Sequence, residues 1–384
     1  MSIVVAFTFF RIPGTKFPKV GQELEQIVAD TVKNNKLIKN CTLHVTRGDG
    51  TFTWAGAAGM AEQADKVPMT KDTPVYIASI TKMYIAVTIM ILYERGLVRL
   101  NDPMSEYLPQ ELIHGLNVYQ EYDYSSEITI EQLLAHTSGI PDYYGEKGKD
   151  GRTLSEIFKD DLQRNWRAED QFARVRNDLT SRSRPGEKAI YSDTNYQLLG
   201  KIIEARTGKP LHLVLSEFLF IPLNLRNTWL AGFPSFREKS SVSVAEVFSE
   251  DVNIAKLRSS TFYWADGGII STPEDEVTFL KALREGRIFK PATLELMHNW
   301  NQIENAGPIR YGFGTMEIKA PSPPSPAMNI LPVWGHMGST GSFLCYSPGK
   351  DLYIAGTINQ TKDNKTALLL MIRVMQLVAR IFGN

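Results

Sequence analysis

The chain has 384 residues, with 42 Lys and Arg residues and 42 Asp and Glu residues, so its formal net charge is zero. This balance excludes a global electrostatic attraction to nucleic acid or to an anionic membrane, and we expect neither as a partner. Apolar residues make up 43% of the chain, which is enough for the core of one large domain or of two interleaved domains.

Residues 1–10 are mostly apolar, but no basic residue precedes them and no small-residue cleavage site follows them. Those two features mark a signal peptide, so we predict that the chain has none and is cytoplasmic. No stretch of the sequence reaches the roughly 18 apolar residues that a membrane-spanning helix needs. The sequence therefore predicts no membrane span.

Hydrophobic periodicity and turn residues predict helices and strands in a simple order. Helical patterns are found over 21–37, over 77–92, from 131 to about 296, and over 366–381. Strand patterns are found over 42–46, 51–54, 310–319, 333–336, 342–346 and 352–358. The proline-rich residues 320–326 cannot lie inside a sheet and must form a loop.

Each end of the chain thus combines a helix with strands, and a long helical block separates the two ends. This order predicts an α+β fold, an α/β sandwich in which an antiparallel sheet formed by both chain ends is flanked by the N- and C-terminal helices. We expect this discontinuous sheet domain to comprise residues 1–78 and 297–384. A large, mainly helical domain is expected to be inserted between them over 79–296.

Ser79 and Lys82 lie three residues apart at the start of the apolar helix. Residues at i and i+3 share one face of a helix, so the two side chains should be neighbours. A lysine in an apolar interior has a depressed pKa and can accept a proton from a serine hydroxyl. For the pair alone, a helix-capping serine followed by an ordinary lysine is an equally good interpretation. A second pair with this spacing, Ser347 and Lys350, falls in a Pro-Gly turn, which cannot stack the two side chains.

Two further stretches combine polar residues with tight turns. Tyr191 follows a Pro-Gly turn at 185–186 and precedes a helix for which Asp193 is a natural N-cap, so its hydroxyl could reach a cleft and act as a base. The alternative is a tyrosine packed at a domain boundary. Residues 334–343 contain three glycines, which would allow a strand edge to offer backbone N–H groups to an oxyanion. The alternative is a glycine-rich strand with a bulge.

The six histidines show no spacing typical of a metal site, and we expect neither a metal nor another cofactor. The two cysteines, Cys41 and Cys345, fit neither a disulfide framework nor a metal knuckle. They could meet across adjacent strands, but buried free thiols are the favoured interpretation.

Three motifs occur in a characteristic order and spacing: Ser79-Ile80-Thr81-Lys82, Tyr191-Ser192-Asp193 and His336-Met337-Gly338. In this the chain resembles the serine β-lactamase-like superfamily, above all the branch that holds class C β-lactamases, family VIII esterases and D-alanyl-D-alanine carboxypeptidases. The resemblance covers nearly the whole chain and implies the β-lactamase/transpeptidase-like fold.

The resemblance also implies roles for individual residues. Ser79 would be the nucleophile that forms an acyl-enzyme, with Lys82 and Tyr191 sharing the roles of general base and general acid. The backbone N–H groups of Ser79 and Ser339 would form the oxyanion hole. The other motif residues would bind the substrate: Asp193, His336, Met337 and Gly338.

Two departures from the family pattern bear on the substrate. Asp193 stands where the family has an asparagine; a carboxylate cannot donate a hydrogen bond, and it could hold Lys82 protonated. His336 and Met337 replace a permanent cation and a hydroxyl donor, which weakens the grip on a substrate carboxylate. We therefore expect a serine hydrolase acting on small-molecule esters or amides, most of all an esterase for short or medium acyl chains, by hydrolysis or by acyl transfer.

Two alternatives stay open at this point. One is a β-lactamase, or a D-amino-acid peptidase or carboxypeptidase, and the other is a catalytically silent relative that serves as a binding protein. The intact Ser79, Lys82 and Tyr191 argue against a silent relative. An α/β-hydrolase is excluded, because the sequence contains no G-x-S-x-G elbow. The oligomeric state stays open.

Overall fold

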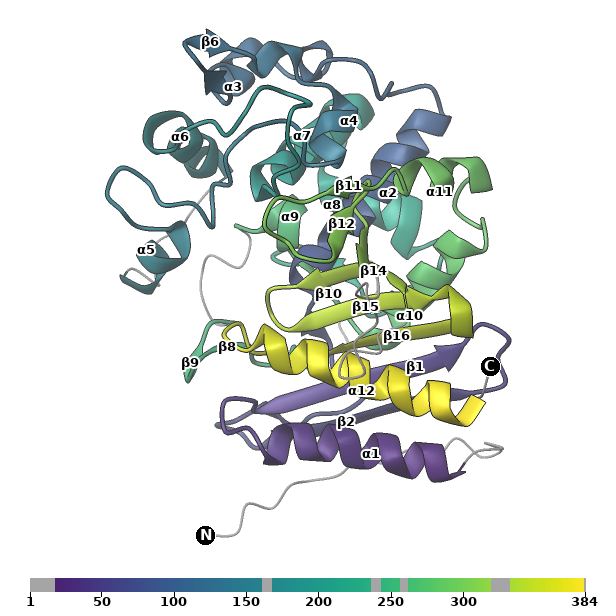
Figure 1. Ribbon diagram of the computed structural model, residues 1–384. Coiled ribbons are helices and arrows are strands. Elements are labelled where there is room, and N and C mark those ends of the chain that lie inside the picture. Colours follow the sequence, from purple (N-terminus) through teal and green to yellow (C-terminus); the bar gives the residue numbers. More distant parts are fainter. Residues whose placement is uncertain (1–17, 161–167, 236–242, 256–261, 319–331, 383–384) are drawn as a thin grey trace.

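The computed structural model of the protein describes residues 18–160, 168–235, 243–255, 262–318 and 332–382 (Figure 1). A large antiparallel sheet lies between layers of helices, and a block of further helices lies beyond one edge of this sheet. The sheet contains strands from both ends of the chain. The predicted α+β fold is therefore confirmed.

Nine strands form the large sheet, in the order β11-β12-β13-β14-β15-β16-β1-β2-β3. The strands are, in chain order, β1 (Asn40–Arg47), β2 (Thr53–Glu62), β3 (Val67–Pro68), β11 (Asn301–Gln302), β12 (Ile309–Tyr311), β13 (Met316–Ile318), β14 (Val333–Gly338), β15 (Ser342–Ser347) and β16 (Leu352–Thr357). β1 pairs antiparallel with β16, with Leu43 opposite Gly356. This pairing hydrogen-bonds the two ends of the chain side by side within the sheet.

Both faces of the central strands are buried. Helices α1 (Pro18–Lys33) and α12 (Asn364–Phe382) cover one face. Helix α10 (Pro273–Arg284) covers the other face. Along β15, Phe343 and Cys345 belong to the core beneath α1 and α12, whereas Leu344 and Tyr346 belong to the core on the opposite face. Successive side chains of a strand point to opposite faces, so coverage on both sides explains the uninterrupted apolar run in the sequence.

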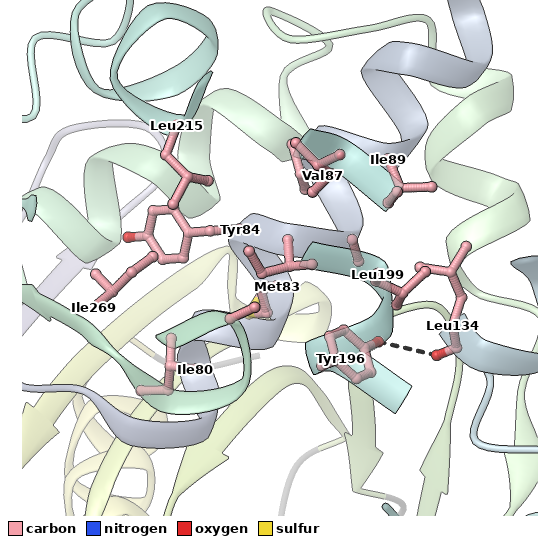
Figure 2. Packing of buried hydrophobic residues seen from close by; sticks show 14 of the residues in the cluster. Ile80, Met83, Tyr84, Val87, Ile89, Leu134, Tyr196, Leu199, Leu215 and Ile269 are labelled. Atoms are coloured by element: carbon pink, nitrogen blue, oxygen red, sulfur yellow. Dashed lines mark hydrogen bonds between the residues drawn. The ribbon is translucent and has the colours of Figure 1, made fainter. Parts of the chain in front are cut away.

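Helix α2 (Thr81–Glu94) runs through the middle of the molecule, and its residues are buried as far as Leu92. Its side chains pack against Tyr196 and Leu199, among others (Figure 2). A short 3-10 turn, η1 (Ala78–Ile80), leads directly into it. Neighbours on every side explain why this helix has no polar face in the sequence.

The remaining elements are short and mostly belong to the helical block. The helices and turns are η2 (Met104–Glu106), α3 (Gln110–Ile113), η3 (Ser125–Glu127), α4 (Ile130–Leu134), α5 (Leu154–Asp160), α6 (Ala168–Asp178), α7 (Asp193–Thr207), α8 (Leu211–Leu215), η4 (Ser216–Phe220), α9 (Trp264–Gly267), α11 (Pro291–Met297) and η7 (Pro348–Lys350). The short strands are β4 (Val75–Tyr76), β5 (Val118–Tyr119), β6 (Tyr122–Asp123), β7 (Trp229–Leu230), β8 (Phe248–Ser249), β9 (Val252–Asn253) and β10 (Ile269–Ser271). A second sheet has the strand order β4-β10-β7, and its strand β4 lies directly before η1 in the chain.

The single strand expected over 310–319 is instead the pair β12 and β13, separated by a tight turn. Gly314 in this turn has φ +67°, and a Cβ there would lie 2.3 Å from Cβ of Ala86 and 2.8 Å from the main-chain oxygen of Lys82. The turn therefore needs glycine both for its backbone conformation and for its close approach to α2. The expected loop at 320–326 lies outside the described residues.

Cys41 and Cys345 are both buried free thiols, as predicted, and burial raises the pKa of each to about 12. Within the described ranges, no His, Cys, Asp and Glu side chains form a group of three that could hold a metal ion. None of the helices in the described part of the chain is both long and apolar enough to cross a membrane.

Glu276 on α10 is buried, and neither of its carboxyl oxygens has a hydrogen-bond partner among the described residues. Burial, and next the charge of Asp275, raises the pKa of Glu276 well above its ordinary value of 4.5. Because the folded state holds this proton more tightly, stability is full below the unfolded-state pKa and falls as the pH rises toward the folded-state pKa. Glu276→Gln is therefore expected to gain about 1.4 kcal/mol of unfolding free energy over wild type for each pH unit in that window.

Urea unfolding of both proteins between pH 5 and pH 8 measures this gain. Glu274→Gln is the matched control, because Glu274 lies on the exposed side of the same helix. If wild type and Glu276→Gln lose stability in parallel over this range, the ionisation of Glu276 does not cause the loss of unfolding free energy with pH.

Candidate active site

Ser79 and Lys82 lie where the chain passes from η1 into α2. Ser79 is the middle residue of η1 and Lys82 is the second residue of α2, so the helix proper begins two residues after the serine. Lys82 Nζ donates a hydrogen bond to Ser79 Oγ at 3.0 Å. The structure therefore brings together the two side chains that the sequence pattern paired.

The C-terminal strands hold the backbone just before Ser79. Thr340 Oγ1 donates to the carbonyl of Tyr76 at 2.9 Å, and Ser342 Oγ donates to the carbonyl of Ile77 at 2.8 Å. A Cβ on Gly338 would lie only 2.4 Å from the carbonyl oxygen of Ile77 and 2.2 Å from Ser342 Oγ. Glycine is therefore needed at position 338, because any larger residue would push η1 away from the sheet.

Lys82 is fully buried, and its Nζ has three oxygen neighbours, two of them hydrogen-bond acceptors and one an ion-pair partner. Besides Ser79, these are the carboxylate of Asp193, with Oδ1 at 2.8 Å, and the main-chain oxygen of Asp266 at 2.7 Å. Burial is the largest influence and would by itself lower the pKa of Lys82, but the negative charge of Asp193 and the smaller contributions of Tyr191 and Asp266 together outweigh it and the pKa is raised. The predicted depressed pKa of this lysine is therefore wrong, because these neighbours together overcome desolvation.

Tyr191 lies against the same two side chains. Its ring centroid lies 5.1 Å from Lys82 Nζ, and Ser79 and Lys82 are both near enough to lower the pKa of its hydroxyl. Burial raises the pKa of Tyr191, although Lys82 opposes the shift. At neutral pH Tyr191 is therefore a phenol that can pass on a proton rather than a standing phenolate.

Asp193 is the first residue of α7 rather than its N-cap, which is Ser192. Its carboxylate contacts Lys82 instead of capping the helix, and its own N–H donates to Asp142 Oδ1 at 3.1 Å. Burial, and then the charge of Asp193, raises the pKa of Asp142 to about 7. Asp142 has no signal in the sequence, since only the fold brings residues 142 and 193 together.

Asp266 lies in α9 (Trp264–Gly267). With Asp142 and Asp193 it forms a group of three carboxyls near Lys82. Its Oδ2 accepts hydrogen bonds from the hydroxyl of Tyr143 and from Gln197 Nε2. Burial, followed by the charge of Asp193, raises the pKa of Asp266 well above its ordinary value. These contacts fix Asp266 and so aim its carbonyl at Lys82.

His136 packs against the ring of Tyr191, and no individual role was expected for it from the sequence. The two rings are 4.3 Å apart between centroids. His136 Nδ1 accepts from the N–H of Ser192 at 3.2 Å, so its proton is on Nε2. Burial lowers the pKa of His136 well below its ordinary value, and Lys82 lowers it further. This neutral histidine fixes the chain just after Tyr191.

A cavity of about 210 Å³ opens beside Ser79. Its wall includes Ser79, Tyr191 and Asp193, and also Ser339 in the turn between β14 and β15. Two carboxyl groups, Asp193 and Asp266, and four tyrosines line it, but no basic side chain of the described residues does. The cavity is thus aromatic and acidic beside the proposed nucleophile.

His336 and Met337 do not line this cavity. His336 is 1% exposed, with Nδ1 2.7 Å from the carbonyl oxygen of Met337 and Nε2 3.0 Å from Tyr311 Oη. Burial, and next the charge of Lys82, lowers the pKa of His336 to about 3, so the ring is neutral. Met337 lines a separate groove with Phe343 and Met371, on the α12 side of the sheet. A substrate-binding role for these two side chains stays a prediction.

Comparisons with known proteins give the family of the chain. Residues 38–378 match the family model described as Beta-lactamase. Acyltransferase mokF of Monascus pilosus is 28% identical over 285 residues, which cover 64% of this chain and 64% of mokF. Penicillin-binding protein 4* of Bacillus subtilis (strain 168) is 25% identical over 283 residues, which cover 71% of this chain and 58% of that protein. The match thus spans less than two thirds of the length of either relative.

The fold has close counterparts among solved structures. A D-stereospecific amidohydrolase from Streptomyces sp. superposes with a TM-score of 0.73 at 25% sequence identity, and the match covers 91% of this chain and 97% of that chain. The family model covers most of the sequence, including all three motifs. The chain therefore belongs to the Beta-lactamase family.

Proposed function

We propose that this chain is an esterase that hydrolyses small-molecule esters with short or medium acyl chains through an acyl-enzyme on Ser79. Ser79 Oγ bonds to the ester carbonyl carbon, while Lys82 and Tyr191 move the serine proton to the oxygen of the leaving alcohol. The backbone N–H groups of Ser79 and Ser339 hold the oxyanion. Water then attacks the acyl-enzyme by the same route and releases the acid.

The charged groups in the cavity wall are the observation that supports a preference for esters. The described lining residues offer carboxyl groups and tyrosines but no basic side chain, and the charge of Lys82 is already paired with Asp193. His336, which stands where the resemblance implies a cation, is buried and neutral. A substrate carboxylate would lie near Asp193 without a cation to pair with, which disfavours β-lactams and D-alanyl peptides.

The other readings have less support. The amidohydrolase and penicillin-binding-protein relatives favour amides or cell-wall peptides, but the acidic cavity does not favour an anionic substrate. The acyltransferase relative supports the same acyl-enzyme with an alcohol in place of water as acceptor. The contacts among Ser79, Lys82 and Tyr191 favour an enzyme over a silent binding protein.

A matched pair of substrates tests the preference. p-Nitrophenyl butyrate and p-nitrophenyl hydrogen succinate share a leaving group and acyl length but differ in a terminal carboxylate. We expect kcat/KM to be about ten- to a hundredfold lower for the succinate, the effect of one missing charge-assisted hydrogen bond. A chromogenic cephalosporin should be turned over more slowly still. Equal or faster turnover of the succinate or the cephalosporin would contradict the proposed substrate class.

A further inference from the structure

Lys82 Nζ bridges Ser79 and Asp193. It lies 3.0 Å from Ser79 Oγ on one side and 2.8 Å from Asp193 Oδ1 on the other, and its third contact is the carbonyl of Asp266. Two hydrogen-bond acceptors and one carboxylate around the nitrogen fit an ammonium group, which has three donors, a positive charge and no lone pair. Such a group can take the proton of Ser79 only if it gives up another proton in the same step.

The contacts of Lys82 leave one destination for that second proton. Its side chain has no exposed surface, so water does not reach it directly. The carbonyl of Asp266 is far too weak a base, and Tyr191 already holds its own proton. The carboxylate of Asp193 remains, and its side chain is 14% exposed and lines the cavity.

We propose that Asp193 is the proton acceptor during acylation, and that Lys82 relays the proton to it from Ser79. As Ser79 Oγ bonds to the acyl carbon, its proton moves to Lys82 Nζ and a different Lys82 proton moves to Asp193 Oδ1. As the bond to the leaving alcohol breaks, Tyr191 gives its proton to the alcohol oxygen. Tyr191 then takes a proton from Lys82, which recovers one from Asp193. This inference rests on the proposed acyl-enzyme mechanism.

The surroundings of Asp193 single it out among the three carboxyls. Asp142 and Asp266 have raised pKa values, in each case from burial and then from the charge of Asp193, and neither carboxyl contacts Lys82. The charge that balances Lys82 is therefore on Asp193. The other titratable groups that face Asp193 are tyrosines: Tyr143, Tyr144, Tyr191, Tyr263 and Tyr311.

Asp193→Asn tests the relay, because it keeps the shape and removes the acceptor. We expect kcat for p-nitrophenyl butyrate at pH 7 to fall at least about a hundredfold with KM within about threefold of wild type, the usual range for a lost general base. Activity should return at alkaline pH, where Lys82 loses its ammonium proton and can act alone. Asp363→Asn, a carboxylate that bonds Asn35 and Thr366 at the start of α12, should leave activity unchanged.

Chemical rescue separates proton acceptance from packing. Formate should restore turnover of Asp193→Gly at pH 7 in a concentration-dependent way, and it should leave Ser79→Ala inactive. A variant of Asp193 that equals or exceeds wild type at pH 7 would overturn the relay, since Asp193 would then only restrain Lys82. A folded Asp193→Gly that formate does not rescue would overturn it as well.

One measurement needs no variant. In mixtures of H₂O and D₂O, the relay moves two protons in one step, so kcat/KM of the wild type should depend on the deuterium fraction along a curve. A straight line would indicate a single proton and would overturn the relay. Failure of the underlying mechanism looks different, because a fluorophosphonate would then leave Ser79 of the wild type unlabelled.

Discussion

Ser79→Ala is expected to lower kcat/KM for aryl esters by about 10⁴-fold or more and to abolish labelling by a fluorophosphonate. The reason is geometric: Ser79 lines the cavity and its Oγ is hydrogen-bonded to Lys82. Mass spectrometry of the peptide that contains Ser79 should show one phosphonyl group in the wild type and none in the variant.

Ser347→Ala is the matched control, because Ser347 and Lys350 repeat the spacing of Ser79 and Lys82. Ser347 is buried at the end of β15, its hydroxyl has no hydrogen-bond partner among the described residues, and Lys350 lies in the η7 turn. Turnover and labelling should therefore be unchanged. Labelling that survives Ser79→Ala, or that is lost in Ser347→Ala, contradicts the choice of nucleophile.

Lys82→Met and Tyr191→Phe are expected to lower kcat/KM by about 10³-fold each, and the double variant should be little worse than the poorer single variant. Both side chains contact Ser79 and each other, so they handle one proton as a unit. Removing either partner leaves the other without a complete path. Steady-state kinetics of the four proteins on one aryl ester measure the coupling.

Multiplying effects, near 10⁶-fold in the double variant, would show that Lys82 and Tyr191 act independently. Thermal unfolding should accompany the kinetics, because Lys82→Met leaves Asp193 without its ion-pair partner. Asn195→Ala is not a suitable control here, since Asn195 contacts His136 beneath Tyr191. Arg373→Met on the outer face of α12 removes a cation without touching the site and serves instead.

Local sequence patterns predicted the main layers well. The α1 and α12 helices, the β1–β2 hairpin and the β15–β16 pair each have an apolar pattern that one or two buried faces explain. The split of β12 from β13 was not predicted, because it depends on the contact of Gly314 with α2, residues far apart in the sequence. The domain boundaries stay a prediction.

The residues of the proposed site that belong to a sequence motif could be predicted. Those that only the fold brings to the site could not. Ser79, Lys82 and Tyr191 belong to recognisable motifs, and the structure brings them into contact. Asp142 and His136 come from the loops around α4, and no spacing relates them to α7. The depressed pKa expected for Lys82 from burial is wrong, whereas the expectation that Asp193 could hold Lys82 protonated agrees with the ion pair between them.

The hydrogen bonds from Thr340 and Ser342 to the carbonyls of Tyr76 and Ile77 join residues 264 and 265 positions apart. During synthesis, Ser79 and Lys82 emerge long before the residues that hold the backbone just ahead of Ser79. Long-range pairing of this kind forms late in folding. A nascent or truncated chain therefore carries Ser79 without the hydrogen bonds that position it, and the proposed site is complete only once the C-terminal strands have joined the sheet.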